Sequence, residues 1–169
     1  MNEQPQMIPK RIVLDTNVCL DLFVFCDPRW ELLLEAMRSG TVDAVTRADC
    51  RMEWQIVLGY ARLGLDTVAQ QRCTEQFDAL IRCLPPHASE QCAAPLPQCR
   101  DRDDQKFMEL ARDADASMLI TKDKALLKLA GKTRRAGLFS ILLPQDWQKM
   151  TESSPALSIT YKSNSATTS

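Results

Sequence analysis

The chain lacks any apolar run close to the roughly 20 residues that cross a bilayer. Residues 1–11 are polar and lack the apolar segment of a signal peptide. These absences predict a cytoplasmic protein with no membrane partner. The formal net charge is −1, so the 169 residues carry no overall basic field. A polyanion would have to be held by local patches of charge.

Histidine is almost absent, and no two cysteines have the Cys-x-x-Cys spacing of a zinc or redox site. The seven cysteines are an odd number, which favours free thiols, and Cys50 and Cys73 lie in helical patterns where a thiol packs like a small apolar group. The lone His87 and the nearby Cys92 could begin a metal site, but a closed zinc site needs further ligands. A single histidine also leaves no Ser/His or Cys/His arrangement for covalent catalysis.

A chain of this length suits one domain with a sizeable core. We expect that domain to span residues 11–150, after an N-terminal segment of residues 1–10. Residues 151–169 are dominated by Ser, Thr and Asn and bury too little apolar surface to order themselves, which predicts a disordered tail. The sequence contains no internal repeat.

Two short apolar runs end in polar residues that include an aspartate. The run 12–14 is followed directly by Asp15, and the run 118–120 is followed by 121–123, which ends in Asp123. Each run is short and leads into a helical pattern, as a buried parallel strand does before its crossover helix. Ligands bind at the carboxyl ends of such strands, because the connecting loops splay apart there. The two aspartates are therefore expected at a binding edge.

Hydrophobic periodicity and turn residues place the other elements. Pro28 opens a helix and Gly40 follows its end, while Asp49 is predicted to cap another helix. The expected strands are 12–14, 42–45, 118–120 and 139–143, and the expected helices are 18–25, 28–38, 49–61, 66–84, 101–113 and 125–130, with a Pro-rich loop at 85–99. This order predicts an α/β fold with a mainly parallel central sheet and helices on both faces.

Glu53 and Asp15 each have a structural and a functional interpretation. Glu53 lies three residues after Cys50 and four before Val57, on the border of an apolar helix stripe. A solvated helix face is the alternative there. For Asp15 the alternative is a turn residue that caps the next helix. Neither residue decides the question alone.

Asp101, Asp103 and Asp104 crowd the start of the helix 101–113. N-capping and compensation of the helix dipole account for one or two of them. Asp104 differs, because Phe107 and Met108 follow it at i+3 and i+4 and put its side chain on the core-facing side. A carboxylate in that position is costly unless it is paired or bound to a metal.

Four carboxylates can meet in one crevice if the sheet is parallel. They are Asp15, Glu53, Asp104 and Asp123. Like charges gathered so closely need a counterion, and oxygen ligands without histidine or cysteine favour Mg²⁺ or Mn²⁺. We predict a metal bound between Asp15, Asp104 and Asp123.

Four motifs, in this order, resemble those of the PIN-domain ribonucleases, and among them the toxin components of bacterial toxin–antitoxin systems. The motifs are Asp15-Thr16-Asn17, the acidic helix around Glu53, residues 101–111 (DRDDQKFMELA) and residues 121–127 (TKDKALL). The resemblance covers about residues 11–147 and implies a three-layer α/β/α PIN-like fold. It also implies a Mg²⁺- or Mn²⁺-dependent endonuclease that cleaves single-stranded RNA, with a small antitoxin protein as partner. The oligomeric state stays open, with a homodimer as one option.

The resemblance implies roles for the matching residues. The catalytic set is Asp15, Glu53, Asp104 and Asp123, and the supporting residues are Thr16, Asn17, Asp101 and Thr121. Asp101 shares or replaces part of the role of Asp104 in one open alternative. Metal ions held by such carboxylates activate water for attack on a phosphodiester. The residues expected to hold RNA phosphates, each with a solvated helix face as its alternative, are Arg51, Arg102, Lys122 and Lys124.

Three other functions compete with the nuclease. A catalytically inactive PIN-like module that binds RNA or protein is disfavoured by the complete acidic set. A haloacid-dehalogenase-like phosphatase needs a second aspartate two residues after Asp15, where Asn17 stands. In a purely structural protein, a core-facing Asp104 would be an unexplained loss of stability.

Overall fold

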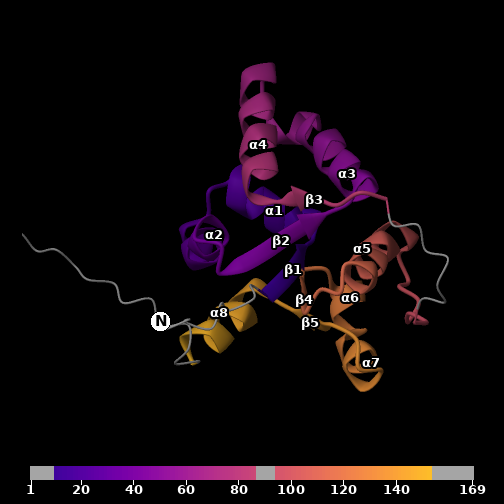
Figure 1. Cartoon of the computed structure of the whole chain (residues 1–169). Coiled ribbons are helices and arrows are strands. Elements are labelled where there is room, and N and C mark those ends of the chain that lie inside the picture. Colours follow the sequence, from indigo (N-terminus) through magenta and orange to yellow (C-terminus); the bar gives the residue numbers. More distant parts are fainter. Residues whose placement is uncertain (1–9, 87–93, 154–169) are drawn as a thin grey trace, which may run out of the picture.

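The computed structural model describes residues 10–86 and 94–153 (Figure 1). The predictions for His87, for Cys92 and for the tail beyond residue 153 lie outside these residues. Five strands form one all-parallel sheet in the order β3-β2-β1-β4-β5. They are β1 (Lys10–Leu14), β2 (Val42–Thr46), β3 (Arg82–Cys83), β4 (Met118–Ile120) and β5 (Ser140–Leu142). The predicted parallel α/β sheet is confirmed.

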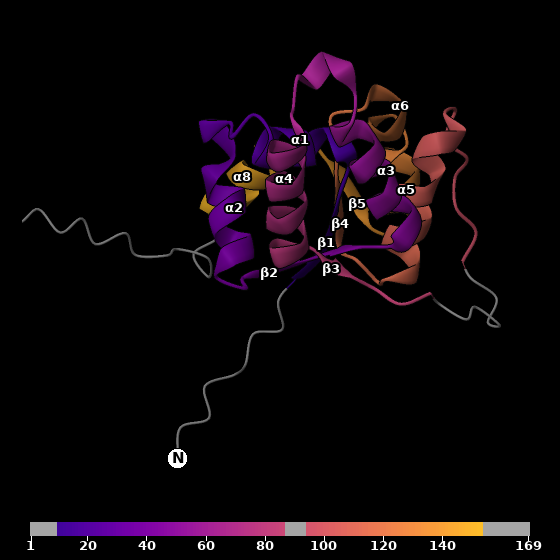
Figure 2. The same ribbon diagram turned by 90° about the horizontal axis from the view of Figure 1, so that it is seen from above.

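Helices cover both faces of the sheet, so the fold has three layers (Figures 1 and 2). One face carries α1 (Thr16–Phe23), α2 (Glu31–Arg38), α4 (Thr67–Leu80) and α8 (Pro144–Glu152). The other carries α5 (Arg102–Asp113), α6 (Lys124–Leu127) and α7 (Ala130–Arg135). Helix α3 (Ala48–Leu58) lies at the border, because its Trp54 joins the first core cluster and its Cys50 joins the second. This arrangement confirms the expected α/β/α layers.

The strands supply both core clusters by strict alternation of side chains. In β1, Ile12 and Leu14 pack on the α1 side of the sheet, whereas Val13 packs on the α5 side. In β4, Ile120 follows the first pattern and Leu119 the second. A strand buried on both faces needs apolar residues at every position, which explains the continuous runs in the sequence.

The helix predicted over 66–84 is too long. Helix α4 ends at Leu80, and Ile81 adopts an extended backbone with φ −118°. The next two residues form β3, which pairs with β2, and the N–H of Leu84 donates to the carbonyl of Thr46 over 2.9 Å. A strand of two residues is too short to show the alternation of apolar and polar residues that identifies a strand in the sequence. Its extended conformation follows from its pairing with β2.

The cap predicted at Asp49 is wrong. Helix α3 begins at Ala48 with Arg47 in the N-cap position, and it ends at Leu58, before Ala61. The carboxylate of Asp49 instead accepts hydrogen bonds from Arg47 at 2.9 and 2.8 Å. A guanidinium two residues away binds both carboxylate oxygens, which competes with capping.

The C-terminal part of the fold has more helix than predicted. The segment 125–130 divides into α6 and the start of α7, and α8 was not expected. Pro144 stands at the first position of α8 and Trp147 is buried, so the signals of a helix start and an apolar anchor were present. Gly40 does follow α2 as predicted, at φ +75°. Within residues 10–86 and 94–153 no helix is long and apolar enough to cross a membrane.

Candidate active site

The register of β1 and β4 brings Asp15 and Thr121 together. Leu14 lies opposite Ile120, and the N–H of Asp15 donates to the carbonyl of Ile120 over 3.0 Å. The Asp15 side chain is almost fully buried, with 3% of the residue exposed, and Thr121 Oγ1 donates to Asp15 Oδ2 over 2.7 Å. A buried carboxylate oriented by a buried hydroxyl therefore forms the floor of the site.

The surroundings of Asp15 oppose its ionisation. Burial raises the pKa of its carboxyl, and the charges of Glu53 and Asp123 raise that pKa further. Hydrogen bonds from Thr121 and from the backbone of Asn17 lower it in part. The side chain of Asn17 is exposed, so its contact with Asp15 comes from the main chain.

Asp123 shares Thr121 with Asp15. The N–H of Asp123 donates to Thr121 Oγ1 over 2.9 Å, and Asp123 Oδ1 caps α6 by accepting from Ala125 and Leu126 at 2.7 and 3.1 Å. One carboxylate oxygen thus serves the helix cap. The other takes no part in that cap and is the one that could face a ligand.

Asp104 lies in the first turn of α5 and is partly buried. Burial, together with the charges of Asp15, Asp123, Asp101 and Glu53, raises the pKa of Asp104 to about 7. The side chain forms no ion pair or hydrogen bond with the rest of the described chain. The four carboxylates predicted from the sequence therefore lie close enough to repel one another.

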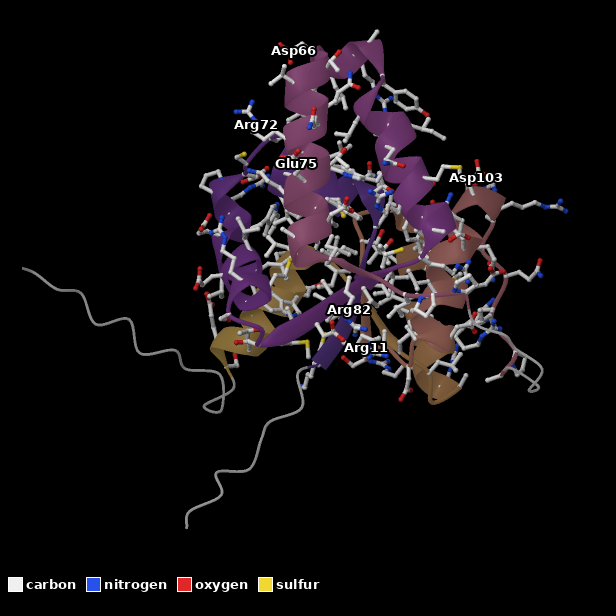
Figure 3. The ribbon with its side chains drawn as sticks, turned by 45° about the horizontal axis from the view of Figure 1, so that its top comes forward. Arg11, Asp66, Arg72, Glu75, Arg82 and Asp103 are labelled. Carbon is white, nitrogen blue, oxygen red and sulfur yellow. The ribbon has the colours of Figure 1, made fainter. Side chains whose placement is uncertain are left out.

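Asp101 and Asp103 differ from Asp104 in their surroundings. Asp101 is the N-cap of α5, and its Oδ1 accepts from the N–H of Asp103 over 2.9 Å. Both residues are exposed, and Figure 3 shows Asp103 at the outer end of α5. Its role as N-cap accounts for the presence of Asp101 without any bound ligand. The Asp104 side chain has no such structural role among the described residues.

Glu53 is held between two helices. Thr16 Oγ1 on α1 donates to Glu53 Oε1 over 2.6 Å, and Lys106 Nζ on α5 forms an ion pair with Glu53 Oε2. Burial opposes the charged form of Lys106, but Glu53 overcomes this and the lysine pKa is raised. Of the four clustered carboxylates, Glu53 is the one with a direct cationic partner among the described residues. Lys106 lies in the motif 101–111, but the sequence did not reveal this pair, because it joins residues 53 positions apart.

Four residues were predicted to bind RNA: Arg51, Arg102, Lys122 and Lys124. Two of them form ion pairs within the protein and two do not. Arg51 forms a bidentate ion pair with Asp78, at 2.8 and 2.6 Å. Lys122 Nζ lies 2.6 Å from Oδ2 of the buried Asp21. The other two are exposed and form no ion pair within the described residues. Half of the set is thus already compensated by carboxylates of the protein.

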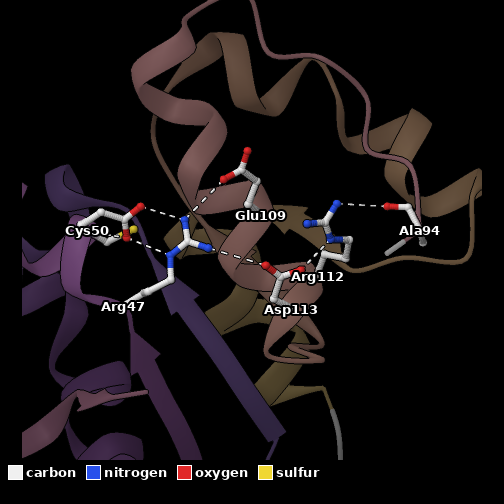
Figure 4. Close-up of polar contacts among 7 residues, drawn as sticks. Arg47, Cys50, Ala94, Glu109, Arg112 and Asp113 are labelled. Carbon is white, nitrogen blue, oxygen red and sulfur yellow. Dashed lines mark hydrogen bonds and ion pairs between the residues drawn. The ribbon is translucent and has the colours of Figure 1, made fainter. Parts of the chain in front are cut away.

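Arg47 connects the two helices that carry acidic residues of the site, a role that the sequence analysis missed. From the start of α3 its guanidinium reaches Asp49 and also Glu109 and Asp113 on α5, at 3.4 and 3.6 Å (Figure 4). Asp113 also pairs with Arg112 at 2.7 Å. This network fixes the spacing between α3 and α5.

The side chains at this edge suit a hard divalent cation, because carboxylate and hydroxyl oxygens dominate. Burial raises the pKa of the nearby Cys99 thiol, and Asp104 and Asp123 raise it further, so the thiol stays protonated and is a poor ligand. Over residues 10–86 and 94–153, no three His, Cys, Asp or Glu side chains are grouped as tightly as ligands around an ion. Asp104 nevertheless has no ion-pair partner among the described residues, and its pKa is raised to about 7. A cation bound beside it would stabilise its charged form.

The five-stranded parallel sheet, covered by helices on both faces, has the three-layer α/β/α architecture of PIN-like proteins, a nuclease-type fold. The model of the PIN-domain family matches residues 11–125, which is more than half of the chain, and the protein belongs to the PIN-domain family. PIN domains are generally nucleases that act on RNA, and they usually use Mg²⁺ or Mn²⁺. No curated protein matches the chain.

Proposed function

We propose that this protein is a metal-dependent endoribonuclease that cleaves single-stranded RNA by attack of water on a phosphodiester bond. The observation that carries the proposal is the environment of Asp104. Its pKa of about 7 reflects burial and the charges of Asp15, Asp123, Asp101 and Glu53 around an unpaired carboxyl. A stable fold gains nothing from such crowding, whereas a divalent cation would relieve it.

Asp15, Asp104 and Asp123 would hold the Mg²⁺ or Mn²⁺ ion. When bound, such an ion lowers the pKa of a water and neutralises charge on the phosphodiester. Thr121 orients the site, because its hydroxyl donates to Asp15 and accepts from the backbone of Asp123. The fixed hydroxyl keeps the two carboxylates in place before the substrate arrives.

Glu53 completes the acidic set on the α3 side. Thr16 fixes one of its oxygens, and Lys106 pairs with the other. This pair holds an ammonium group beside the carboxylates, where it can contact a phosphate oxygen. Arg102 and Lys124 are exposed and free to bind further phosphates, whereas Arg51 and Lys122 would have to exchange their carboxylate partners for phosphate.

We propose further that this nuclease is the toxin of a toxin–antitoxin pair. The support is the resemblance of its four motifs to those toxins and its membership of the PIN-domain family. An unregulated ribonuclease in the cytoplasm would damage the cell, so a small protein partner that covers the acidic edge would be needed. Lys122 and Lys124 flank Asp123, and such a partner would mask them together with it.

The test compares wild type with Asp15→Asn. Both proteins are incubated with labelled single-stranded RNA in Mn²⁺ or in EDTA, and both are induced in growing cells. We expect only wild type with Mn²⁺ to cut RNA and only wild type to stop growth. Asp115→Asn is the matched control, since it removes the same charge from an exposed turn whose φ of +52° asparagine adopts readily.

One result would overturn the nuclease, and another would overturn the role of Asp15 in it. If Asp15→Asn and wild type slow growth equally and neither cuts RNA, the inactive binding module replaces the nuclease. If both cut equally, the metal site does not include Asp15. Calorimetry with Mn²⁺ on the two proteins separates these cases, because loss of metal binding in Asp15→Asn is expected independently of activity.

A further inference from the structure

The segment 122–135 concentrates positive charge in a chain whose formal net charge is −1. It contains six lysines and arginines and a single acidic residue, Asp123. The positive residues are Lys122, Lys124, Lys128, Lys132, Arg134 and Arg135. The rest of the chain is therefore acidic overall.

Five of these residues are exposed and form no ion pair with any part of the chain that the structure describes. We call them the basic strip: Lys124, Lys128, Lys132, Arg134 and Arg135. By contrast, Lys122 is compensated by Asp21, as Arg51 is by Asp78. Unpaired cations can bind phosphate without first giving up a carboxylate partner.

The helices below the basic strip are anchored in the core. Leu126 and Thr133 are fully buried and Leu129 is 7% exposed. Lys132 and Arg135 are spaced at i and i+3 on α7 and share one side of that helix, and the exposed Lys128 lies at the C-cap of α6, just before α7 begins. The charges are thus presented by a rigid surface rather than by a loose loop.

The basic strip begins at the acidic edge. Lys124 follows Asp123 directly as the first residue of α6, and Lys128 is the C-cap of that helix. Helix α7 then packs beside β5, the strand that follows it in the chain (Figure 1). Its six residues extend the basic strip by about 9 Å away from the carboxylates.

We propose that the basic strip binds the sugar–phosphate backbone of single-stranded RNA on one side of the cut. This inference rests on the proposed function and names where its substrate lies. A phosphodiester chain that enters the acidic edge meets Lys124 first, because Lys124 adjoins Asp123. Phosphates of a stacked strand repeat every ~3.4 Å along the axis, so α7 spans about three of them. Continuity with the carboxylates favours RNA over an acidic protein as the occupant.

The test uses the triple variant Lys128→Gln/Lys132→Gln/Arg135→Gln and a matched control, Arg62→Gln/Arg72→Gln/Lys149→Gln. The control removes the same charge from exposed positions on other elements, and Figure 3 shows Arg72 on α4. Fluorescence anisotropy of a labelled 12-nucleotide RNA in EDTA gives the Kd at several salt concentrations. We expect the basic-strip variant to bind about tenfold more weakly at low salt and to lose about two from the salt slope, since each single-strand phosphate contact contributes ~0.7. The control is expected to bind like wild type.

The outcomes separate this inference from the nuclease itself. A tetranucleotide too short to reach α7 should be cut equally by wild type and by the double variant Lys132→Gln/Arg135→Gln in Mn²⁺, because both changed residues lie on α7. If wild type cuts RNA but the basic-strip variant binds RNA as tightly as wild type does, the basic-strip proposal alone fails. Equal weakening in the control variant would also overturn it, because it would reveal a general charge effect. Displacement of the RNA by polyglutamate at equal charge would assign the surface to acidic proteins instead.

Discussion

Carboxylates near the amino ends of the strands and those near the carboxyl ends have opposite electrostatic surroundings. Near the amino ends of the strands, Asp43 accepts from Arg11 at 3.1 Å and from Arg82 at 2.6 Å, and Figure 3 shows both arginines beside the start of β1. At the carboxyl ends, Asp15 and Asp104 have no cationic partner within the described residues. Near the amino ends, two arginines bind one carboxylate. At the carboxyl ends, several carboxylates lie near one another, and among the described residues only Glu53 has a cationic partner.

The pKa values follow this difference. Burial would raise the pKa of Asp43, but hydrogen bonds from Arg82 and Arg11 lower it overall. Burial also raises the pKa of Asp104, and there the neighbouring charges add to the rise, to about 7. Ionised Asp43 therefore stabilises the fold, and ionised Asp104 destabilises it unless a cation is bound. The carboxylate near the amino ends of the strands stabilises the fold, whereas the crowded carboxylates at the carboxyl ends fit the proposed cation site.

The largest expected effect comes from Asp123→Asn. We expect RNA cleavage to fall by at least about 100-fold, because the proposed metal site would lose one of its charges. The fold should survive, since asparagine also caps helices and can accept from Ala125 and Leu126. Thermal melting in EDTA should place the variant at or above wild type. A variant that melts much lower would mean that Asp123 is mainly a structural cap.

Asp43→Ala should act in the opposite way. It leaves Arg11 and Arg82 without their shared carboxylate, so we expect a loss of about 1–3 kcal/mol in the free energy of unfolding. Urea denaturation measures the loss, with the exposed Glu35→Ala as control. RNA cleavage per folded molecule should not change. Unchanged stability together with lost cleavage would remove the distinction between the edges.

Asp104→Asn should stabilise the metal-free protein. The folded-state pKa of about 7 lies above the usual aspartate value, so the protonated form is favoured by folding. In EDTA, wild type should therefore gain stability as the pH falls from about 7 to about 4, and the variant should lack this gain. The difference at pH 8 should be on the order of 1 kcal/mol once solvent screening is allowed for. Urea midpoints at several pH values test it, and parallel curves for the two proteins would contradict it.

The smallest effect is expected for Asp49→Asn. Arg47 holds the pKa of Asp49 at about 2, below the ordinary value near 4. The stability from this pair is present above about pH 4 and is lost as the pH falls through about 2. Because the Asp49 side chain is 47% exposed, the loss at neutral pH should stay below about 1 kcal/mol. A larger loss by urea denaturation would make the Arg47 network a main support of the site.

Much of the fold was predictable because its signals are local. The runs 12–14 and 118–120 had to be strands, since each is too short for a helix and apolar at every position. The strand β3 was not predictable, because two residues carry no period and their shape depends on pairing with β2. The cap at Asp49 failed for a similar reason, since Arg47 competes for the same carboxylate.

The gathering of the acidic residues was predictable, whereas the contacts that each of them makes were not. Asp15 and Asp123 follow apolar runs, and this position at strand ends is visible in the chain itself. The hydrogen bond from Thr121 to Asp15 joins residues 106 positions apart and depends on the register of β1 with β4. Likewise, only the packing of α3 against its neighbours decides that Lys106 pairs with Glu53 and that Arg51 is compensated by Asp78.

The sequence by itself determined the class of fold and the edge at which the acidic residues gather, and the oxygen ligands found there are the basis for proposing Mg²⁺ or Mn²⁺. These follow from short-range periodicity and from residue chemistry, which neighbours along the chain express directly. Only the tertiary structure decided which charges are neutralised and which remain. Asp43 meets two arginines and Asp104 meets other carboxylates, because strand register and helix packing bring distant residues within a few ångströms. At that range burial and pairing, rather than residue type, set the energy of a charge.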